Sequence, residues 1–434
     1  MFRCRWRALV GVRRFSQAHV QWQRKDYLEV LGSKYPTDDW TNVSSRLLTL
    51  TTRRLMFQAN SPLRHLKCRI EEFFQKNYRK TLSTSPLFSV HDNLSPVVSV
   101  WENFDSLLVP EDHVSRSKSD TYYINKDFLL RAHTSAHQHS LISAGRDQFL
   151  VFGDVYRRDE IDRTHFPCFH QMEAMRLFSA EELFYPKRVD NSDLALFEQI
   201  STERTESKQE SHTFDCAKVL ELSMKTCLEE LVRHIFGQDL ECQWTRTSFP
   251  FTHPSWELEI MYQGEWLESL GCGIVEQRLL RSAGAGHKVG WAFGLGLERL
   301  AMKLYSIPDI RLFWCRDPSF HLQFATDDHN KNIAYKPNPK GLAPASPKDV
   351  SFWLSSERFH PNDFYDLVRN VEPDLVEQVK LIDDFQHPKT KRRSHCYRII
   401  YRATDRTLQK TEVAEIHDKV RQAVVQKYDV ELRL

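Results

Sequence analysis

The sequence predicts an α+β fold in which a mainly antiparallel sheet flanked by helices is followed by a smaller α+β domain. Two observations carry this prediction. In the first part of the chain, short extended segments are separated by turns and by occasional helices, without the regular strand–helix alternation of a parallel sheet. A polar stretch with four prolines, residues 326–350, then separates this part from a compact pattern of strand, helix, strand, strand, helix and strand.

Length and composition place the chain among globular proteins. It has 434 residues, 41% of them hydrophobic and 27% charged, which is enough for two or three domains with cores of their own. No run approaches the roughly 18 uninterrupted apolar residues that a membrane span needs, so we expect no membrane partner. The nine cysteines are scattered without a C-x-x-C pair, so neither a disulfide framework nor a zinc site is expected.

The net charge of +2 conceals an asymmetry. Residues 1–25 carry seven basic side chains and no acidic one, whereas residues 26–434 carry 53 basic and 58 acidic groups. An Arg-rich, acid-free N-terminus with interspersed apolar residues is typical of a mitochondrial presequence, which predicts a location in the mitochondrial matrix. The alternative is a disordered basic arm that binds nucleic acid.

The first domain, predicted at 26–325 with an N-terminal extension, begins its core with a helix. Ser61 and Pro62 suit an N-cap and a first helical position, and an apolar stripe follows at helical spacing through Leu63, Leu66 and Ile70 to Phe73 and Phe74. A second helix is expected at 214–236. Extended segments are expected at 87–90, 97–101, 148–156, 168–178, 256–262, 265–270 and 290–293.

The second domain is predicted at 342–434, after a linker at 326–341. Its elements are expected as strand 351–354, helix 363–370, strands 376–385 and 394–403, helix 411–427 and strand 429–434. This order is the split, ferredoxin-like β-α-β-β-α-β arrangement, which also underlies RNA-recognition modules.

Glycine is scarce, at 14 residues, and its distribution points to a site. Eight of the 14 lie in the window 264–296. Glycines let the backbone approach a ligand closely, so this window is a candidate binding region. Tight hairpin turns are the alternative explanation.

Two predicted strands carry a set of side chains that suits a nucleotide and an amine. The first strand ends at Arg157, and alternation places Phe169, Gln171 and Glu173 of the return strand on one face. The aromatic ring can stack a purine, the guanidinium can neutralise a phosphate and the carboxylate can receive an ammonium group. A surface ion pair is the alternative for a strand with one Arg and one Glu.

Two further segments combine glycine or polar residues with a helix start. Gly294 and Gly296 precede a helix that carries Arg299 in its first turn, an arrangement that suits an anionic ligand. The full dinucleotide-binding pattern is absent, since position 299 is Arg where a third glycine belongs. The polar run 133–138 opens another helix, and the alternative there is a solvated N-cap.

Taken together and in this order, these segments resemble the three signature motifs of class II aminoacyl-tRNA synthetases, and most closely the phenylalanyl-tRNA synthetase family. The resemblance covers roughly residues 50–434 and extends to its single-chain mitochondrial form, with an anticodon-binding domain on the same chain. The matching segments are the helix 61–74 with Pro96, residues 103–105 (NFD), 130–135 (LRAHTS), 153–173, 249–255 (FPFTHPS), 271–273 (GCG) and 291–299.

The resemblance implies an activity and assigns roles to residues. Phenylalanine and ATP would form phenylalanyl-adenylate and pyrophosphate, and the aminoacyl group would pass to the 2′-hydroxyl of the terminal adenosine of tRNA(Phe). Arg157 would bridge the substrate carboxylate and the α-phosphate, Phe169 and Arg299 would hold the adenine, and Glu268 would position magnesium with ATP. Thr164, His165 and Phe166 would lie over the phosphates, and the amino-acid end would involve His133, Ser135, Ala136, His137, Gln138, Gln171, Met172 and Glu173.

The side-chain pocket implied by the resemblance consists of Phe249, Phe251, Ala292 and Phe293, whose ring contacts favour an aromatic substrate. Such a pocket rejects an added hydroxyl by only ~100-fold, which makes tyrosine the main competitor. The sequence leaves no stretch for an editing domain, so no hydrolytic proofreading is expected. Two departures from the family pattern are Asp159, where Glu is usual, and Trp256, where Phe is usual.

The second domain has a charge pattern of its own. Within 388–410, eight basic side chains oppose only Asp405, and we expect Lys389, Lys391, Arg392 and Arg393 to contact tRNA. A solvated charged hairpin is the alternative. Because the chain carries both modules, it is expected to act as a monomer. Competing functions are another class II ligase or adenylating enzyme, and a non-catalytic RNA-binding paralogue.

Overall fold

The computed structural model describes residues 26–80, 83–184, 194–337, 344–355 and 359–433. The predicted presequence, residues 1–25, lies outside these ranges. Within them, no helix is long and apolar enough to cross a membrane.

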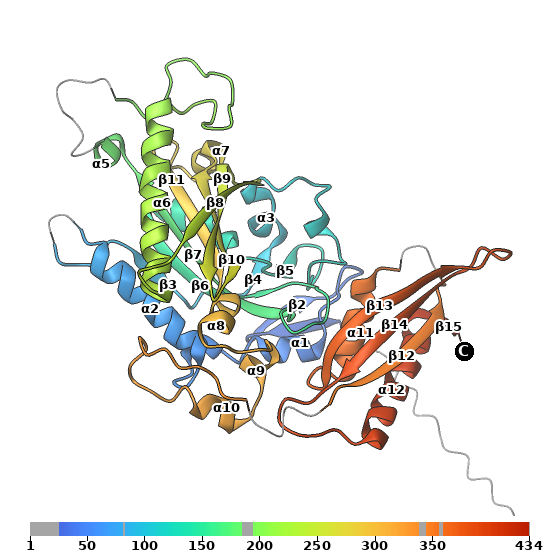
Figure 1. Cartoon of the computed structure of the whole chain (residues 1–434). Coiled ribbons are helices and arrows are strands. Elements are labelled where there is room, and N and C mark those ends of the chain that lie inside the picture. The colour runs from blue at the N-terminus through green and yellow to red at the C-terminus, as the bar shows by residue number, and fades with distance from the viewer. Residues whose placement is uncertain (1–25, 81–82, 185–193, 338–343, 356–358, 434) are drawn as a thin grey trace, which may run out of the picture.

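A seven-stranded sheet forms the centre of the first domain (Figure 1). All neighbouring strands are antiparallel except the β3–β6 pair at one edge, which is parallel. The predicted mainly antiparallel sheet is therefore confirmed. In spatial order the strands are β3 (Ser89–His91), β6 (Gln148–Tyr156), β7 (Cys168–Phe178), β11 (Val289–Gly296), β10 (Glu265–Val275), β9 (Thr252–Tyr262) and β8 (Cys242–Phe249).

Helices cover both faces of this sheet. The larger core joins one face to α2 (Pro62–Asn77), α6 (Phe214–Phe236) and α8 (Leu297–Leu304). A smaller core joins the other face to α3 (Val100–Asn103), α4 (Gln138–Ser143) and α7 (Gln277–Ser282). Smaller elements surround them: β1 (Tyr27–Val30), β2 (Ser33–Pro36), α1 (Ser45–Leu50), β4 (Val97–Ser99), β5 (Phe128–Leu130), α5 (Ala180–Phe184), α9 (Arg311–Trp314), α10 (Pro318–Leu322) and 3-10 turns at 55–57, 105–107, 114–116 and 134–137.

Capping residues account for two helix starts. The Ser61 side chain accepts from the backbone N–H of Leu63, and Pro62 occupies the first turn, as predicted. The predicted extension of a strand to residue 101 is wrong, because β4 ends at Ser99. The hydroxyl of Ser99 accepts from the N–H of Glu102, whose carboxylate accepts from the N–H of Ser99, and this capping box starts α3 at Val100.

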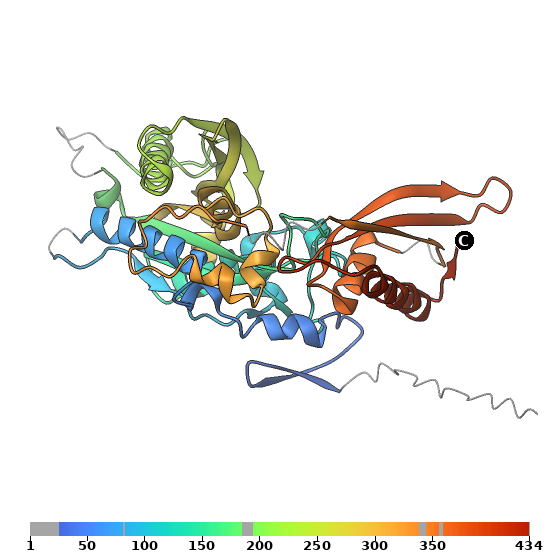
Figure 2. The ribbon, with the colours of Figure 1, turned by 60° about the horizontal axis from the view of Figure 1, so that its bottom comes forward.

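The second domain is a four-stranded sheet in the order β13-β14-β12-β15, with the predicted β-α-β-β-α-β connectivity. Both of its helices, α11 and α12, lie on the same side of the sheet (Figure 2). The strands are β12 (Ser346–Trp353), β13 (Val376–Gln386), β14 (Arg393–Tyr401) and β15 (Glu431–Leu432), and the helices are α11 (Pro361–Val371) and α12 (Lys410–Tyr428).

The polar stretch 326–350 is more ordered than the sequence predicts. Residues 346–350 belong to β12, because pairing with β14 brings in Ser346 and Pro347 despite their low strand propensity. Arg69 of α2 donates to the carbonyl of Lys331 (2.9 Å) and to the side chain of Asn332 (2.9 Å). Tyr335 is buried in the larger core, so the described part of the predicted linker is attached to the first domain.

The two domains meet at the segment that connects β6 to β7. Arg158 of this segment is buried and pairs with Asp366 (2.6 Å) and Asp363 (2.8 Å) of α11. The N–H of Val379 in β13 donates to the carbonyl of Ile161 (2.9 Å), and the Ile161 side chain lies in the core of the second domain. The segment that connects β6 to β7 in the first domain is therefore part of the interface with the second domain.

Candidate active site

A cavity of about 820 Å³ opens on the sheet face that carries the smaller core. Strands β7, β10 and β11 form its floor, and the 133–138 segment, the β6–β7 connection and the start of α8 form its walls. The predicted site residues that line it are His133, Ser135, Gln138, Arg157, Thr164, His165, Phe166, Phe169, Gln171, Glu173, Phe249, Phe251, Glu268, Ala292, Phe293 and Arg299.

Glu173 supplies a buried carboxylate at one end of the cavity. It accepts from the hydroxyls of Ser135 and Thr134, the latter at 3.4 Å, and from the Gln138 amide at 2.7 Å. Burial raises the pKa of Glu173 to about 7, although the bonds from Ser135 and Gln138 act in the opposite direction. The Oε1 atom of Gln138 is buried and has no hydrogen-bond partner among the described residues, so two acceptors in this corner suit a cationic donor.

Arg157 supplies a half-buried cation in the same cavity. Its Nε donates to the carbonyl of Ala132 (2.8 Å), and its guanidinium lies 5.3 Å from the ring centroid of Phe169. Burial lowers the pKa of Arg157. Arg157 forms no ion pair with any described residue, although the charge of Asp159 acts on it, so its guanidinium can pair with an anion that enters the cavity.

The apolar end of the cavity is formed by aromatic rings. Phe249 and Phe251 stack with ring centroids 5.9 Å apart, and Ala292 is buried beside them. Phe293 borders the cavity, but its ring lies in the larger core near Phe74 and Trp291. The absence of a side chain at Gly271 leaves room for the Phe249 ring, because a Cβ at position 271 would lie 2.9 Å from that ring. The glycine-rich window therefore forms turns and, at Gly271, also leaves room for a ring that lines the pocket.

A buried hydrogen-bonded pair fixes α8 to the sheet. Glu298 accepts from the backbone N–H of His170 (2.8 Å) and is bonded to its ring Nδ1 (2.7 Å). Both side chains are buried. This connection holds the first turn of α8 against β7, so that Arg299 and Phe169 line the same cavity. Arg299 pairs with Glu268 at 3.3 Å, and both remain about half exposed.

The β6–β7 connection is ordered by Asp162. Its carboxylate accepts from the N–H of Thr164 (2.7 Å) and of His165 (2.8 Å) and is bonded to His165 Nδ1 (2.9 Å). These bonds lower the pKa of Asp162 and raise that of His165. Phe166 stacks on Trp314 with centroids 5.2 Å apart, which anchors the end of the segment.

Three predicted site residues do not line the cavity. Met172 lies in the larger core, since strand alternation turns it away from Gln171 and Glu173 to the opposite face of the sheet. Ala136 is fully buried in the smaller core. His137 is bonded through Nε2 to the guanidinium of Arg131 (2.7 Å), behind the 133–138 segment.

The structure also adds residues that sequence reasoning missed. Glu257 of β9 and Lys303 of α8 line the cavity, and so does His113. Alternation along β9 is the signal that could have identified Glu257, because Trp256 and Leu258 on either side of it are core residues. Of the two departures, Asp159 lines the cavity, whereas Trp256 is buried outside it under Lys225, 4.6 Å from the ring centroid.

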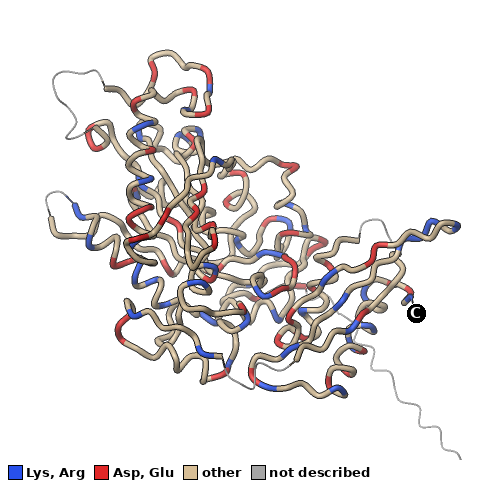
Figure 3. The backbone as a smooth tube through the Cα atoms, viewed as in Figure 1, with Lys and Arg blue, Asp and Glu red and all other residues tan. Residues whose placement is uncertain are grey.

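The predicted RNA-contacting hairpin projects from the second domain, and Lys and Arg gather at its tip (Figure 3). Its charge is partly neutralised: Arg392 pairs with Glu431 (2.9 Å), and Arg393 pairs with Asp384. Lys389 and Lys391 are exposed and form no ion pair with any described residue. The structure thus divides the four predicted cations into two paired arginines and two free lysines.

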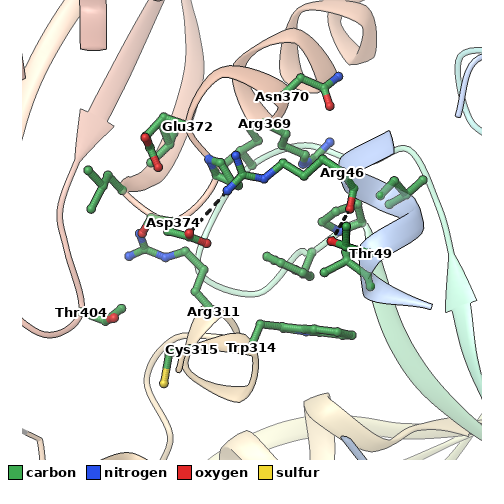
Figure 4. Close-up of a pocket in the computed structure, with 18 of the residues that line it drawn as sticks. Arg46, Thr49, Arg311, Trp314, Cys315, Arg369, Asn370, Glu372, Asp374 and Thr404 are labelled. Atoms are coloured by element: carbon green, nitrogen blue, oxygen red, sulfur yellow. Dashed lines mark hydrogen bonds and ion pairs between the residues drawn. The ribbon is translucent and has the colours of Figure 1, made fainter. Parts of the chain in front are cut away.

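A larger cavity, about 1160 Å³, lies between the two domains, and Figure 4 shows side chains from both lining it. Some of its charged groups are already paired. Arg46 pairs with Asp374 (3.4 Å), and Arg311 pairs with Asp309 (2.7 Å). The smaller cavity, with its half-buried cation and separate buried carboxylate, is therefore the better candidate for a reaction site.

Comparisons with known proteins match both domains. The family model "tRNA synthetases class II core domain (F)" matches residues 81–177 and 173–324, and "Ferredoxin-fold anticodon binding domain" matches residues 342–433. "Phenylalanine--tRNA ligase, mitochondrial" of Mus musculus is 53% identical over 96% of this chain and 91% of its own length. The probable counterpart of Drosophila melanogaster is 47% identical over 94% and 92%, respectively. The phenylalanine--tRNA ligase alpha subunit of Vibrio campbellii is 32% identical over 64% of this chain and 71% of its own length.

Proposed function

Because the chain belongs to the phenylalanine--tRNA ligase family of class II aminoacyl-tRNA synthetases, we propose that it activates phenylalanine with ATP and transfers it to tRNA(Phe) in mitochondria. Phenylalanyl-adenylate is the intermediate and pyrophosphate the first product. The aminoacyl group then passes to the 2′-hydroxyl of the terminal adenosine, and AMP is released.

The observation that carries this proposal is the distribution of charge and apolar surface in one cavity. Glu173 offers a carboxylate for an ammonium group, and Arg157 offers a carboxylate a cation that has no ion pair among the described residues. The stacked rings of Phe249 and Phe251 accept an aromatic side chain. An α-amino acid with an aromatic ring satisfies all three at once.

The chemistry follows from positioning and charge neutralisation. A carboxylate oxygen of phenylalanine attacks the α-phosphorus of ATP, a new O–P bond forms, and the bond to the pyrophosphate oxygen breaks. Arg157, which lines the cavity, would contact both reacting anions and offset the charge that accumulates on the phosphorus oxygens. Phe169 and Arg299 supply a ring and a guanidinium for the adenine. No proton has to be removed from the substrate carboxylate, so this step needs no general base.

The cavity residues also fit magnesium bound with ATP. Glu257 and Glu268, on neighbouring strands, line the cavity with carboxylate oxygens, the donors that Mg²⁺ prefers. Bound there with the nucleotide, magnesium would neutralise phosphate charge. The Arg299–Glu268 pair orients that carboxylate beside the predicted adenine site.

Amino-acid-dependent pyrophosphate exchange tests the activity. Phenylalanine should stimulate exchange of labelled pyrophosphate into ATP, and leucine should not. Exchange with leucine but not phenylalanine would contradict the substrate assignment. If no amino acid stimulates exchange, the result would instead indicate the non-catalytic RNA-binding alternative.

We also propose that the enzyme works as a monomer in the mitochondrial matrix and performs no hydrolytic editing. One chain supplies both the catalytic and the anticodon-binding module, which supports the monomer. Rapid hydrolysis of tyrosyl-tRNA by the purified protein would overturn the proposal on editing. Sedimentation at micromolar protein concentration tests the oligomeric state.

A further inference from the structure

Asn103 is fully buried, and its side chain does not line the cavity. It is the last residue of α3 and belongs to the segment 103–105, one of those that resemble the synthetase family. No side chain of that segment lines the cavity, so none of them contacts a substrate bound there. The hydrogen bonds of Asn103 nevertheless connect it to the site.

The Asn103 side chain is bonded to the backbone of Ala132. Its Oδ1 accepts from the N–H of Ala132 at 3.0 Å, and both residues are buried. Strand β5 ends at Leu130, so the pairing of β5 with β4 supplies no partner for Ala132. A buried backbone N–H needs an acceptor, and here a side chain provides it.

The carbonyl of the same Ala132 holds Arg157. It accepts from Nε of Arg157 at 2.8 Å, and the Arg157 side chain forms no other hydrogen bond with a described residue. The Phe169 ring also lies close, 5.3 Å from the guanidinium, but a ring face does not fix the direction of a guanidinium as a hydrogen bond does. The position of the Ala132 carbonyl therefore determines how Arg157 points into the cavity.

A single residue, Ala132, thus joins Asn103 to Arg157. We propose that Asn103 is a positioning residue for the activation of phenylalanine, because it fixes the peptide groups of Ala132 and thereby the guanidinium of Arg157. The inference rests on the proposed function, which assigns Arg157 to the substrate carboxylate and the α-phosphate. Placement matters there, since a displacement of about 1 Å can cost roughly 100-fold in rate.

The short helix α3 holds Asn103 itself in place. The capping box of Ser99 and Glu102 fixes the start of the helix, and the hydroxyl of Ser106 donates to the carbonyl of Glu102 at 2.9 Å. The next residue, Phe104, is buried in the smaller core. Anchors on both sides of Asn103 give its side chain the fixed support that a positioning residue requires.

The side chain and the backbone of Asn103 act on different parts of the site. Burial lowers the pKa of His133 to about 3, and a bond to the backbone carbonyl of Asn103 acts in the opposite direction. The Nδ2 atom of Asn103 is buried and has no hydrogen-bond partner among the described residues. Replacing the side chain therefore removes the bond to Ala132 and leaves the group that acts on His133 in the chain.

The test compares the binding of phenylalanine with that of phenylalaninol, which has the same ring and ammonium group but no carboxylate. Asn103→Leu keeps the approximate volume of the side chain and removes the acceptor. Calorimetry should show a loss of roughly 10- to 100-fold in affinity for phenylalanine and little change for phenylalaninol. The kcat of phenylalanine-dependent pyrophosphate exchange should fall by a similar factor.

Three further variants separate positioning from loss of structure. Asn103→Asp keeps an oxygen where Ala132 donates, and burial favours its neutral form, so it should retain most of the activity. Asn103→Ser, whose hydroxyl is too short to reach Ala132, gives the same comparison if Asn103→Leu does not fold. Asn125→Leu is the matched control, because Asn125 is also buried and accepts from the backbone N–H groups of Asp127 and Phe128. It should lower the melting temperature and leave the ratio of the two affinities unchanged.

A double-mutant cycle shows whether Asn103 acts through Arg157. Arg157→Ala alone should weaken the binding of phenylalanine. Adding Asn103→Leu should weaken it little further, because the group that Asn103 positions is gone. Losses that simply add would overturn the inference.

The remaining outcomes distinguish this inference from the proposed function. Unchanged phenylalanine affinity and kcat in Asn103→Leu, or equal losses of affinity for phenylalanine and phenylalaninol, would overturn the positioning role alone. An Asn103→Asp variant as impaired as Asn103→Leu would do the same. Lack of phenylalanine-dependent exchange in the unaltered protein would overturn the proposed function instead.

Discussion

At the scale of single residues, Glu173 gives the clearest dependence on pH. Its pKa is about 7 in the free protein, and the ionised form is the one that attracts an ammonium group. As pH falls through 7, Glu173 takes up a proton and loses that attraction. We therefore expect kcat/KM for phenylalanine, measured by pyrophosphate exchange, to fall toward tenfold per pH unit below about 7.

The variant Glu173→Gln provides the control for this assignment. It should lower kcat/KM for phenylalanine by ~10- to 100-fold, because a bond to a charged group is lost, and it should remove the inflection near pH 7. An inflection that persists in Glu173→Gln would mean that another group controls the profile.

The small side chain of Ala292 determines how large a substrate ring the predicted pocket can accommodate. It is 4% exposed and lies beside Phe251 in a packed core. Added methyl groups in Ala292→Val would project toward the predicted substrate ring, and overpacking costs ~1–3 kcal/mol. We expect KM for phenylalanine to rise by roughly 5- to 100-fold, whereas KM for ATP stays near its original value; equal increases in both would contradict the assignment of this pocket.

Residue roles also show what the sequence could and could not predict. The residues of β7 that face the cavity follow from strand alternation, and the same alternation excludes Met172. The contact of His137 with Arg131 could not be predicted, because it depends on how the 133–138 segment lies over β6. Glu257, in contrast, could have been predicted, because Trp256 and Leu258 on either side of it are core residues and strand alternation turns it to the cavity face.

At the scale of elements, the bond between β7 and α8 determines where Arg299 lies. Glu298→Ala would leave the N–H and the ring Nδ1 of His170 buried without this acceptor, at a cost of about 1–3 kcal/mol for each unsatisfied group. We expect a lower melting temperature and a raised KM for ATP. Calorimetry and pyrophosphate exchange measure the two effects, and a variant with unchanged KM for ATP would show that α8 needs no such anchor.

The sequence predicted the bounds of helices and strands best where the element is most fully buried. The predicted bounds of β6, β7 and α6 match the structure, because these long segments carry strong apolar patterns. Strand β8 was missed, since it is an edge strand whose side chains are exposed or half-buried throughout. The strand β12 begins earlier than expected because its pairing with β14 is a tertiary interaction.

At the scale of the whole molecule, positive charge is concentrated at a few places and is not spread over the surface. Residues 26–434 carry a small excess of acidic groups, and the free lysines lie at the hairpin tip (Figure 3). The double variant Lys389→Ala and Lys391→Ala should weaken tRNA binding and reduce the slope of log affinity against log salt by about 1–2. The variant Lys126→Ala, on the first domain, is the control; an unaltered slope in the double variant would contradict the assignment.

The docking of the two domains should influence the nucleotide site. Arg369 of α11 donates to the backbone carbonyls of Asp159 and Glu160, in the segment whose later residues line the cavity. Arg369→Ala should therefore raise KM for ATP several-fold, although Arg369 lies outside the cavity. Arg421→Ala, in an exposed pair on α12, is the matched control and should have no effect.

The β6–β7 connection belongs to two surfaces at once, with Arg157 and Phe166 facing the cavity and Arg158 and Ile161 facing the second domain. A ligand of the second domain that shifts this segment should therefore change the affinity of the predicted nucleotide site, and nucleotide should change the affinity for that ligand by the same factor. The expected consequence is that the two domains report on each other's occupancy through one short stretch of chain.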